Sequence, residues 1–209
     1  MIKLKSNVLF NLIGNGWLGL LTLVVTPIQV RLLGVEAFGF VGLIAILQIL
    51  LSLLDLGVSA TVTKVLSSDH SNNHQESIKA VNTASTIYWL TALAIGGLVL
   101  FTSEAIATDW LTNTSLDTKS VQTSLQLIGA YLCLRWPVAF YMSVISGLQR
   151  MDLLNQIKIL VQTLRLGGSV IVLLFVPTLA AFLLWFAVSS AIELLLYYAA
   201  TRKLLPQLR

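Results

Sequence analysis

The 209-residue chain carries 56% hydrophobic and 11% charged residues, and its mean hydropathy is +0.87. Because a soluble domain carries roughly 25% charged residues, this composition excludes a water-soluble fold and indicates a protein whose solvent is lipid. The net charge of +4 does not indicate a nucleic-acid partner, since the basic residues lie at the ends of apolar runs, where membrane topology places them.

Six apolar runs are long enough to cross a bilayer as helices, which takes about 20 residues each. In chain order, the predicted spans are residues 7–33, 37–66, 80–101, 121–146, 156–176 and 178–201. The first run follows Lys3 and Lys5 as a signal peptide would, but it exceeds the roughly 7–15 apolar residues of a signal peptide. The second run is longer than a bilayer needs, so its end is expected to project into the cytoplasm. The sequence thus predicts an all-α, multi-pass membrane protein with one six-helix unit over residues 1–209.

The distribution of basic residues between the loops predicts the orientation in the membrane, because cytoplasmic loops are enriched in Lys and Arg. With the N-terminus inside, the outer side carries only Arg31 and Lys119. The cytoplasmic side carries Lys3, Lys5, Lys64, Lys79, Arg150, Lys158, Arg202, Lys203 and Arg209. Both termini are therefore predicted to be cytoplasmic.

Four charged residues fall well inside predicted spans, namely Asp55, Arg135, Arg165 and Glu193. At about 1.5 Å rise per residue, all four lie in one slab, roughly 13–17 Å from the cytoplasmic face. A charge at membrane depth costs at least about 2.5–3.5 kcal/mol, so such residues normally face a bundle interior or a wet cavity. Two are positive and two are negative, and mutual pairing could offset much of that cost.

Polar residues also recur at helical spacing on five of the spans, which favours a hydrated central cavity. The candidate binding residues among them are Asn11 and Asn15 on the first span and Gln162 on the fifth. The alternative is that these stripes are interhelical contacts and that Arg165 and Glu193 form a structural pair. Pro137, two residues after Arg135, would either break the helix beside a binding site or merely kink it.

Other chemistry has little support in the sequence. His70 and His74 are four residues apart, but the surrounding Ser and Asn residues indicate a solvated loop rather than a metal site. No cofactor is expected. Cys133 is the single cysteine, so the chain itself forms no disulfide.

Three segments resemble motifs of a known family of membrane proteins. Residues 26–39 resemble the end of the first span in polysaccharide exporters, where a proline precedes an Arg-x-Leu-Gly-x-Glu-x-(Phe/Tyr)-Gly turn. Residues 55–60 resemble the Asp-Leu-Gly-x-Ser signature of their second span. Residues 147–152 resemble the Gly-Leu-Gln-Arg-x-(Asp/Glu) loop after their fourth span. Together they resemble the O-antigen and polysaccharide flippases of the multidrug, oligosaccharidyl-lipid and polysaccharide exporter superfamily.

The resemblance implies a glycan carried on a polyprenyl diphosphate and moved across the bacterial plasma membrane by alternating access between two six-helix lobes. The chain matches the first lobe only, so a second lobe or a second copy is an expected partner besides the lipid bilayer. Arg135 and Arg165 are expected to face the diphosphate and Arg31 to lie at the outer exit. Asp55 and Glu193 would hold the arginines or carry a coupling ion.

Three alternatives to a flippase remain open. A drug or cation antiporter of the same superfamily would share the fold but favour acidic cavity residues. A non-transporting subunit of a glycan-export complex would explain the single lobe. A membrane enzyme is disfavoured, because the longest outer loop, residues 102–120, holds no paired acid and base.

Overall fold

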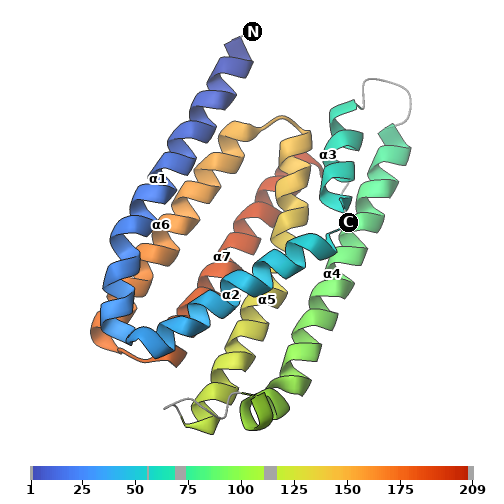
Figure 1. Cartoon of the computed structure of the whole chain (residues 1–209). Coiled ribbons are helices and arrows are strands. Elements are labelled where there is room, and N and C mark those ends of the chain that lie inside the picture. Colours follow the sequence, from blue (N-terminus) through green and yellow to red (C-terminus); the bar gives the residue numbers. More distant parts are fainter. Residues whose placement is uncertain (1, 56, 69–73, 111–116, 207–209) are drawn as a thin grey trace.

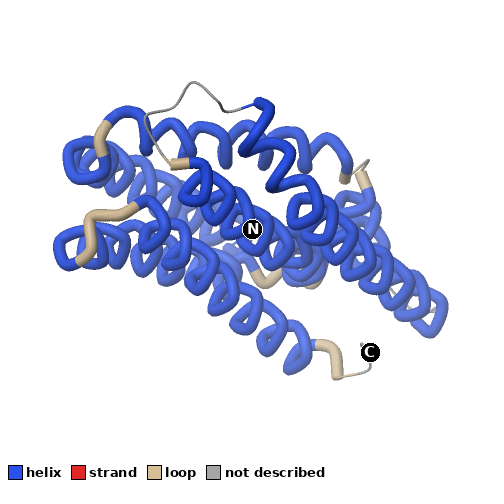
Figure 2. The backbone as a smooth tube through the Cα atoms, turned by 90° about the horizontal axis from the view of Figure 1, so that it is seen from below, coloured by secondary structure: helices blue, strands red, loops and turns tan. Residues whose placement is uncertain are grey.

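The computed structural model describes residues 2–55, 57–68, 74–110 and 117–206, with the backbone alone at residues 2–13, 74, 109 and 110. All regular structure in these residues is helical (Figure 2). The elements are α1 (Ile2–Leu33), α2 (Val35–Leu54), α3 (Val58–Ser68), α4 (His74–Ala105), a π-helical turn η1 (Ile106–Trp110), α5 (Thr118–Gly147), α6 (Met151–Phe175) and α7 (Leu179–Leu204).

Six of these helices are long and apolar enough to span a membrane, as the hydropathy pattern predicts. The candidate spans are Gly14–Leu33, Val35–Leu54, Gln75–Thr108, Thr118–Gly147, Met151–Phe175 and Leu179–Leu204. Many large apolar side chains on them are exposed, including Leu23, Phe101 and Phe175. Such a surface is stable only when lipid or another apolar partner covers it, so the chain is an all-α, multi-pass membrane protein.

The predicted second span, 37–66, is two helices in the structure. The break falls between Leu54 and Val58, where Gly57 adopts a φ of +79° that an L-residue side chain disfavours. Gly34 opens the corner between α1 and α2 in the same way, with a φ of +83°. In contrast, α5 runs without a break through Pro137. Of the two alternatives for Pro137, a break in the fourth span is therefore not found, and the described break between Leu54 and Val58 is a separate feature of the predicted second span.

Helix α5 is the centre of the bundle. It packs against α4 on one side and α7 on the other, and α3, α6 and α2 also contact it. Helix α1 packs on α6, and α2 crosses the front of the bundle diagonally (Figure 1). Buried side chains of α5 such as Ile128, Leu132, Phe140 and Tyr141 fill the core along its length. The residues that α5 carries are thereby held in a rigid frame.

Two glycines allow close helix packing around this frame. A Cβ added to Gly147 of α5 would lie 2.8 Å from the Leu66 Cβ of α3. A Cβ added to Gly168 of α6 would lie 2.2 Å from Cζ2 of Trp185 on α7. Side chains at either position would force neighbouring helices apart, because atoms cannot approach so closely.

Candidate functional site

The centre of the bundle holds a charge triad, formed by Arg135 on α5, Arg165 on α6 and Glu193 on α7. Glu193 Oε1 accepts a hydrogen bond from Nη1 of Arg135 at 2.8 Å, and Oε2 accepts one from Nη2 of Arg165 at 2.5 Å. Glu193 is 2% exposed, so its single carboxylate bridges two guanidinium groups in a dry environment. Two positive charges against one negative charge leave the triad with a net charge of +1.

Arg165 is fixed by its surroundings and is only 4% exposed. Its Nε donates to Ser189 Oγ at 2.9 Å, and Nη2 donates to Ser190 Oγ at 3.1 Å. Its guanidinium carbon lies 5.6 Å from the ring centre of Tyr131 on α5. The backbone carbonyl of Arg165 accepts the indole N–H of Trp185 at 3.0 Å. Arg165 thus ties α6 to α7 and points into the protein rather than into open space.

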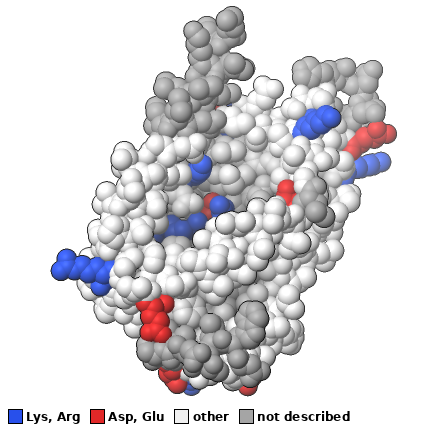
Figure 3. All heavy atoms as spheres, viewed as in Figure 1, with Lys and Arg blue, Asp and Glu red and all other residues white. Residues whose placement is uncertain are grey.

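Arg135 differs from Arg165 because 27% of its side chain is exposed. That exposed part borders a central cavity of about 380 Å³. The cavity is lined by Gln48, Leu51, Ser52, Asp55, Ser59, Arg135, Trp136, Ala139 and Met142. The face seen in Figure 3 is hollowed at its centre, with basic and acidic atoms at the floor of the hollow. The cavity wall thus combines a cation on α5 with amide, hydroxyl and carboxylate groups on α2 and α3.

Asp55 forms the second polar cluster, with Ser59 and Tyr88; this is the Asp55 cluster. Tyr88 of α4 and the Ser59 hydroxyl both donate to Asp55 Oδ1, the latter at 3.0 Å. The Ser59 backbone N–H donates to Oδ2 at 3.3 Å, so the carboxylate caps the first turn of α3. The structure therefore brings Arg135, Arg165 and Glu193 together and keeps Asp55 apart, satisfied by hydrogen bonds at the α2–α3 break.

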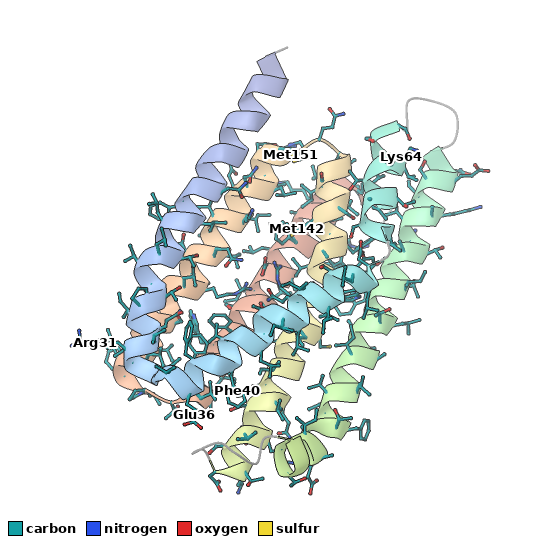
Figure 4. The ribbon with its side chains drawn as sticks, in the orientation of Figure 1. Arg31, Glu36, Phe40, Lys64, Met142 and Met151 are labelled. Atoms are coloured by element: carbon teal, nitrogen blue, oxygen red, sulfur yellow. The ribbon has the colours of Figure 1, made fainter. Side chains whose placement is uncertain are left out.

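The remaining sequence candidates lie outside the described cavity lining. Arg31 is exposed in the last turn of α1, far from the cavity residue Met142 (Figure 4). Asn15 of α1 accepts a hydrogen bond from Lys158 Nζ of α6 at 2.8 Å. Gln162 is half-buried on α6. The side chain of Asn11 lies outside the described residues.

Side-chain hydrogen bonds join α1 to α6 at several levels, including the bond between Asn15 and Lys158. Gln29 donates to Ser169 Oγ at 2.7 Å in the buried interface of these helices. Trp17 donates to Thr163 Oγ1 at 3.0 Å at an exposed position between the same two helices. These hydrogen bonds are interhelical contacts of the kind that the alternative interpretation of the stripes describes.

Sequence reasoning missed two aromatic residues of the site, Tyr88 and Trp136. Tyr88 lies in the middle of the predicted span 80–101, whereas Tyr in membrane helices is enriched at the interfaces. This unusual depth could have predicted that the Tyr88 hydroxyl hydrogen-bonds to a buried polar group, which is Asp55 in the structure. Trp136 adjoins Arg135 in the chain, and its buried indole N–H has no hydrogen-bond partner among the described residues.

No metal centre is found in the part of the chain that the structure describes, since no three His, Cys, Asp or Glu side chains gather there. His70 and the side chain of His74 lie outside the described residues. The groups that line the central cavity are a guanidinium, a carboxylate, hydroxyls, an amide and an indole.

Comparison with known proteins agrees with this assembly of membrane helices around a polar cavity. A family model described as "Polysaccharide biosynthesis protein" matches residues 4–208. The chain therefore belongs to the polysaccharide biosynthesis protein family, as the three motifs suggested. Membership supports a general role in polysaccharide export and a transporter rather than an enzyme. Neither the curated proteins nor the solved structures gave a match to this chain.

Proposed function

We propose that the chain helps to flip a polyprenyl-diphosphate-linked oligosaccharide from the cytoplasmic to the outer leaflet of a bacterial plasma membrane, with both termini cytoplasmic. The observation that best supports this function is the placement of Arg135. It is a guanidinium deep within a membrane helix, and the exposed part of its side chain borders a cavity. A diphosphate entering the bilayer needs such a partner, because guanidinium binds phosphate oxygens in bidentate fashion.

In this proposal the two central arginines have different roles. Arg135 contacts the diphosphate, whereas Arg165 holds Glu193 and through it orients Arg135. This division follows from exposure, since Arg165 is buried among Ser189, Ser190 and Glu193. The net positive charge of the triad attracts an anion, and the bound Glu193 keeps that charge moderate enough for release.

The opposite wall suits the carbohydrate that follows the diphosphate. Gln48 and Ser52 of α2, and Asp55 at its end, line the same cavity as Arg135. Amide, hydroxyl and carboxylate groups donate to and accept from sugar hydroxyls. A second six-helix unit, from the same protein or another copy, would close the open side. Arg31 would lie at the outer exit.

The test is complementation in bacteria that lack their own polysaccharide flippase, with surface glycan as the readout. We expect wild-type protein to restore glycan, alone or co-expressed with the second lobe of a related exporter. Arg135→Gln should lower the restored glycan about tenfold or more, because a charge-assisted hydrogen bond contributes about 1.5–3 kcal/mol. Arg150→Gln, which removes an exposed loop arginine paired with Asp152, is the matched control.

Two results would contradict the proposal. One is full restoration by Arg135→Gln at wild-type membrane levels. The other is that the wild-type protein, with its second lobe supplied, lowers accumulation of a cationic drug but exports no glycan. The second result would favour an antiporter, for which the carboxylate of Asp55 in the cavity wall would be the natural cation partner.

A further inference from the structure

A second cavity lies on the side of the bundle, between α4 and α7, with α5 as its floor. This lateral groove has a volume of about 440 Å³. It is lined by Ser85, Thr86, Trp89, Leu90, Leu93, Tyr141, Tyr198 and Arg202. None of these residues lines the central cavity described above. A ligand in the groove would therefore leave the central cavity open.

The wall of the lateral groove is organised by direct contacts between its aromatic side chains. The indole N–H of Trp89 on α4 donates to the hydroxyl of Tyr141 on α5 at 3.0 Å. The ring of Tyr141 meets that of Tyr198 on α7 edge to face, with centroids 5.6 Å apart. The guanidinium carbon of Arg202 lies 5.7 Å from the Tyr198 ring centre. This connected series fixes one face of the groove before any ligand arrives.

The groove changes from basic to apolar along its length. The contacts of Tyr141 with Trp89 and with Tyr198 show that these three residues of α4, α5 and α7 lie at about the same height in the bundle. Arg202, in the last turn of α7, lies one helical turn beyond Tyr198, about 6 Å towards that end of the bundle. Leu93 lies one turn beyond Trp89 in the opposite direction, because α4 and α7 run antiparallel (Figure 1). Leu90 and Leu93 are both 62% exposed.

We propose that the lateral groove binds an anionic glycerophospholipid in the leaflet at the α7 C-terminus. The phosphate would lie at Arg202, the glycerol region against Tyr198 and Trp89, and one acyl chain along Leu90 and Leu93. Charge complementarity selects this occupant, because a basic site between membrane helices binds anionic headgroups. Tyr198, near the C-terminus of α7, suits the headgroup region, and Trp89 with the exposed leucines farther from Arg202 suits the glycerol and acyl parts of the same molecule.

Lipid binding at this groove is independent of what the protein transports, so it can be tested without a transport assay. The purified full chain in neutral detergent is titrated with phosphatidylglycerol or phosphatidylcholine. Bound lipid is counted by native mass spectrometry, and thermal unfolding is followed in parallel. Three proteins are compared, namely the wild type, Arg202→Gln and Lys203→Gln. Lys203 is the matched control because it is the adjacent exposed cation and does not line the groove.

We expect the wild type to retain phosphatidylglycerol in preference to phosphatidylcholine. Arg202→Gln should weaken that binding about fivefold, since one basic side chain near the surface contributes about that factor, whereas Lys203→Gln should bind as the wild type does. Unfolding without lipid verifies that both variants fold. Equal retention of the two lipids, equal losses in the two variants, or no loss in Arg202→Gln would each overturn the proposal.

Discussion

The two polar clusters around the central cavity neutralise buried charge in different ways. The charge triad uses ion pairs between α5, α6 and α7, three helices that run through the core without interruption. The Asp55 cluster uses hydroxyl groups and one backbone N–H at the break between α2 and α3. Ion pairs in a dry core hold their geometry, whereas hydrogen bonds at a helix end can be exchanged one at a time. We therefore expect the cationic wall of the cavity to be the more rigid one and the acidic wall to be the more adaptable one.

The largest effect should come from Glu193, since it alone joins the two arginines. Glu193→Gln would leave both guanidinium groups without a charged partner, and breaking a buried pair costs about 3–5 kcal/mol. We expect a matching loss of unfolding free energy in detergent and less folded protein in the membrane. Asp152→Asn is the control, because it removes an exposed carboxylate that pairs with Arg150. Equal stabilities of the two variants would mean that the triad does not stabilise the fold.

A glycine on α6 tests the rigid wall through packing alone. Gly168→Ala would place a methyl group against Trp185, whose indole holds the backbone of Arg165. We expect a destabilisation of about 3 kcal/mol, typical of the larger overpacking effects in cores. Gly167→Ala is a matched control, since nothing lies within 4 Å of a Cβ there. The control should be neutral or stabilising by up to about 1 kcal/mol through helix propensity. Similar unfolding temperatures for the two variants would contradict this packing.

Substitutions in the acidic wall should lower the free energy of unfolding by less than those in the cationic wall, and Tyr88→Phe tests the size of this loss. Tyr88→Phe removes a hydroxyl that donates to the Asp55 carboxylate. Because the acceptor is charged, we expect a loss of about 2 kcal/mol. Tyr197→Phe removes a bond of 3.2 Å to the neutral carbonyl of Leu154 and should cost about 1 kcal/mol. Denaturation of both variants in the same detergent decides the order, and a larger loss for Tyr197→Phe would refute a charged acceptor at Tyr88.

The sequence predicted the depth of the charged residues in the membrane better than it predicted which neighbours their side chains face. Counting the helical rise placed Arg135, Arg165 and Glu193 in one slab, and the structure joins them. The same count placed Asp55 in that slab, but depth does not say which way a helix is rotated. Asp55 faces Tyr88 of α4 instead of an arginine. The rotation depends on packing between helices, which hydropathy along one chain does not encode.

The helix boundaries show a similar division between what hydropathy encodes and what it does not. Apolar length alone was enough to predict the six spans, because the bilayer sets the length of each one. Hydropathy did not reveal the interruption at Gly57, since a glycine within an apolar run can be either helical or a break. The sequence feature that indicates a break is Asp55, because its carboxylate can cap a new helix. In the structure it accepts hydrogen bonds from Ser59, four residues further along the chain.

A substitution at the α2–α3 break should have the smallest effect on stability. It also tests whether the acidic wall of the cavity bends at Gly57. Gly57 has a φ of +79°, and nothing lies within 4 Å of a Cβ added there. Gly57→Ala should therefore lower the free energy of unfolding by about 1 kcal/mol through backbone strain, without any steric clash of the added methyl group. Gly39→Ala, also without neighbours within 4 Å but inside helix α2, should instead be neutral or stabilising. If the α2–α3 break bends during transport, Gly57→Ala should slow glycan export in the complementation assay more than its small stability loss explains. Export equal to that of Gly39→Ala would show that the break is a static feature of the wall and that the cavity changes shape elsewhere.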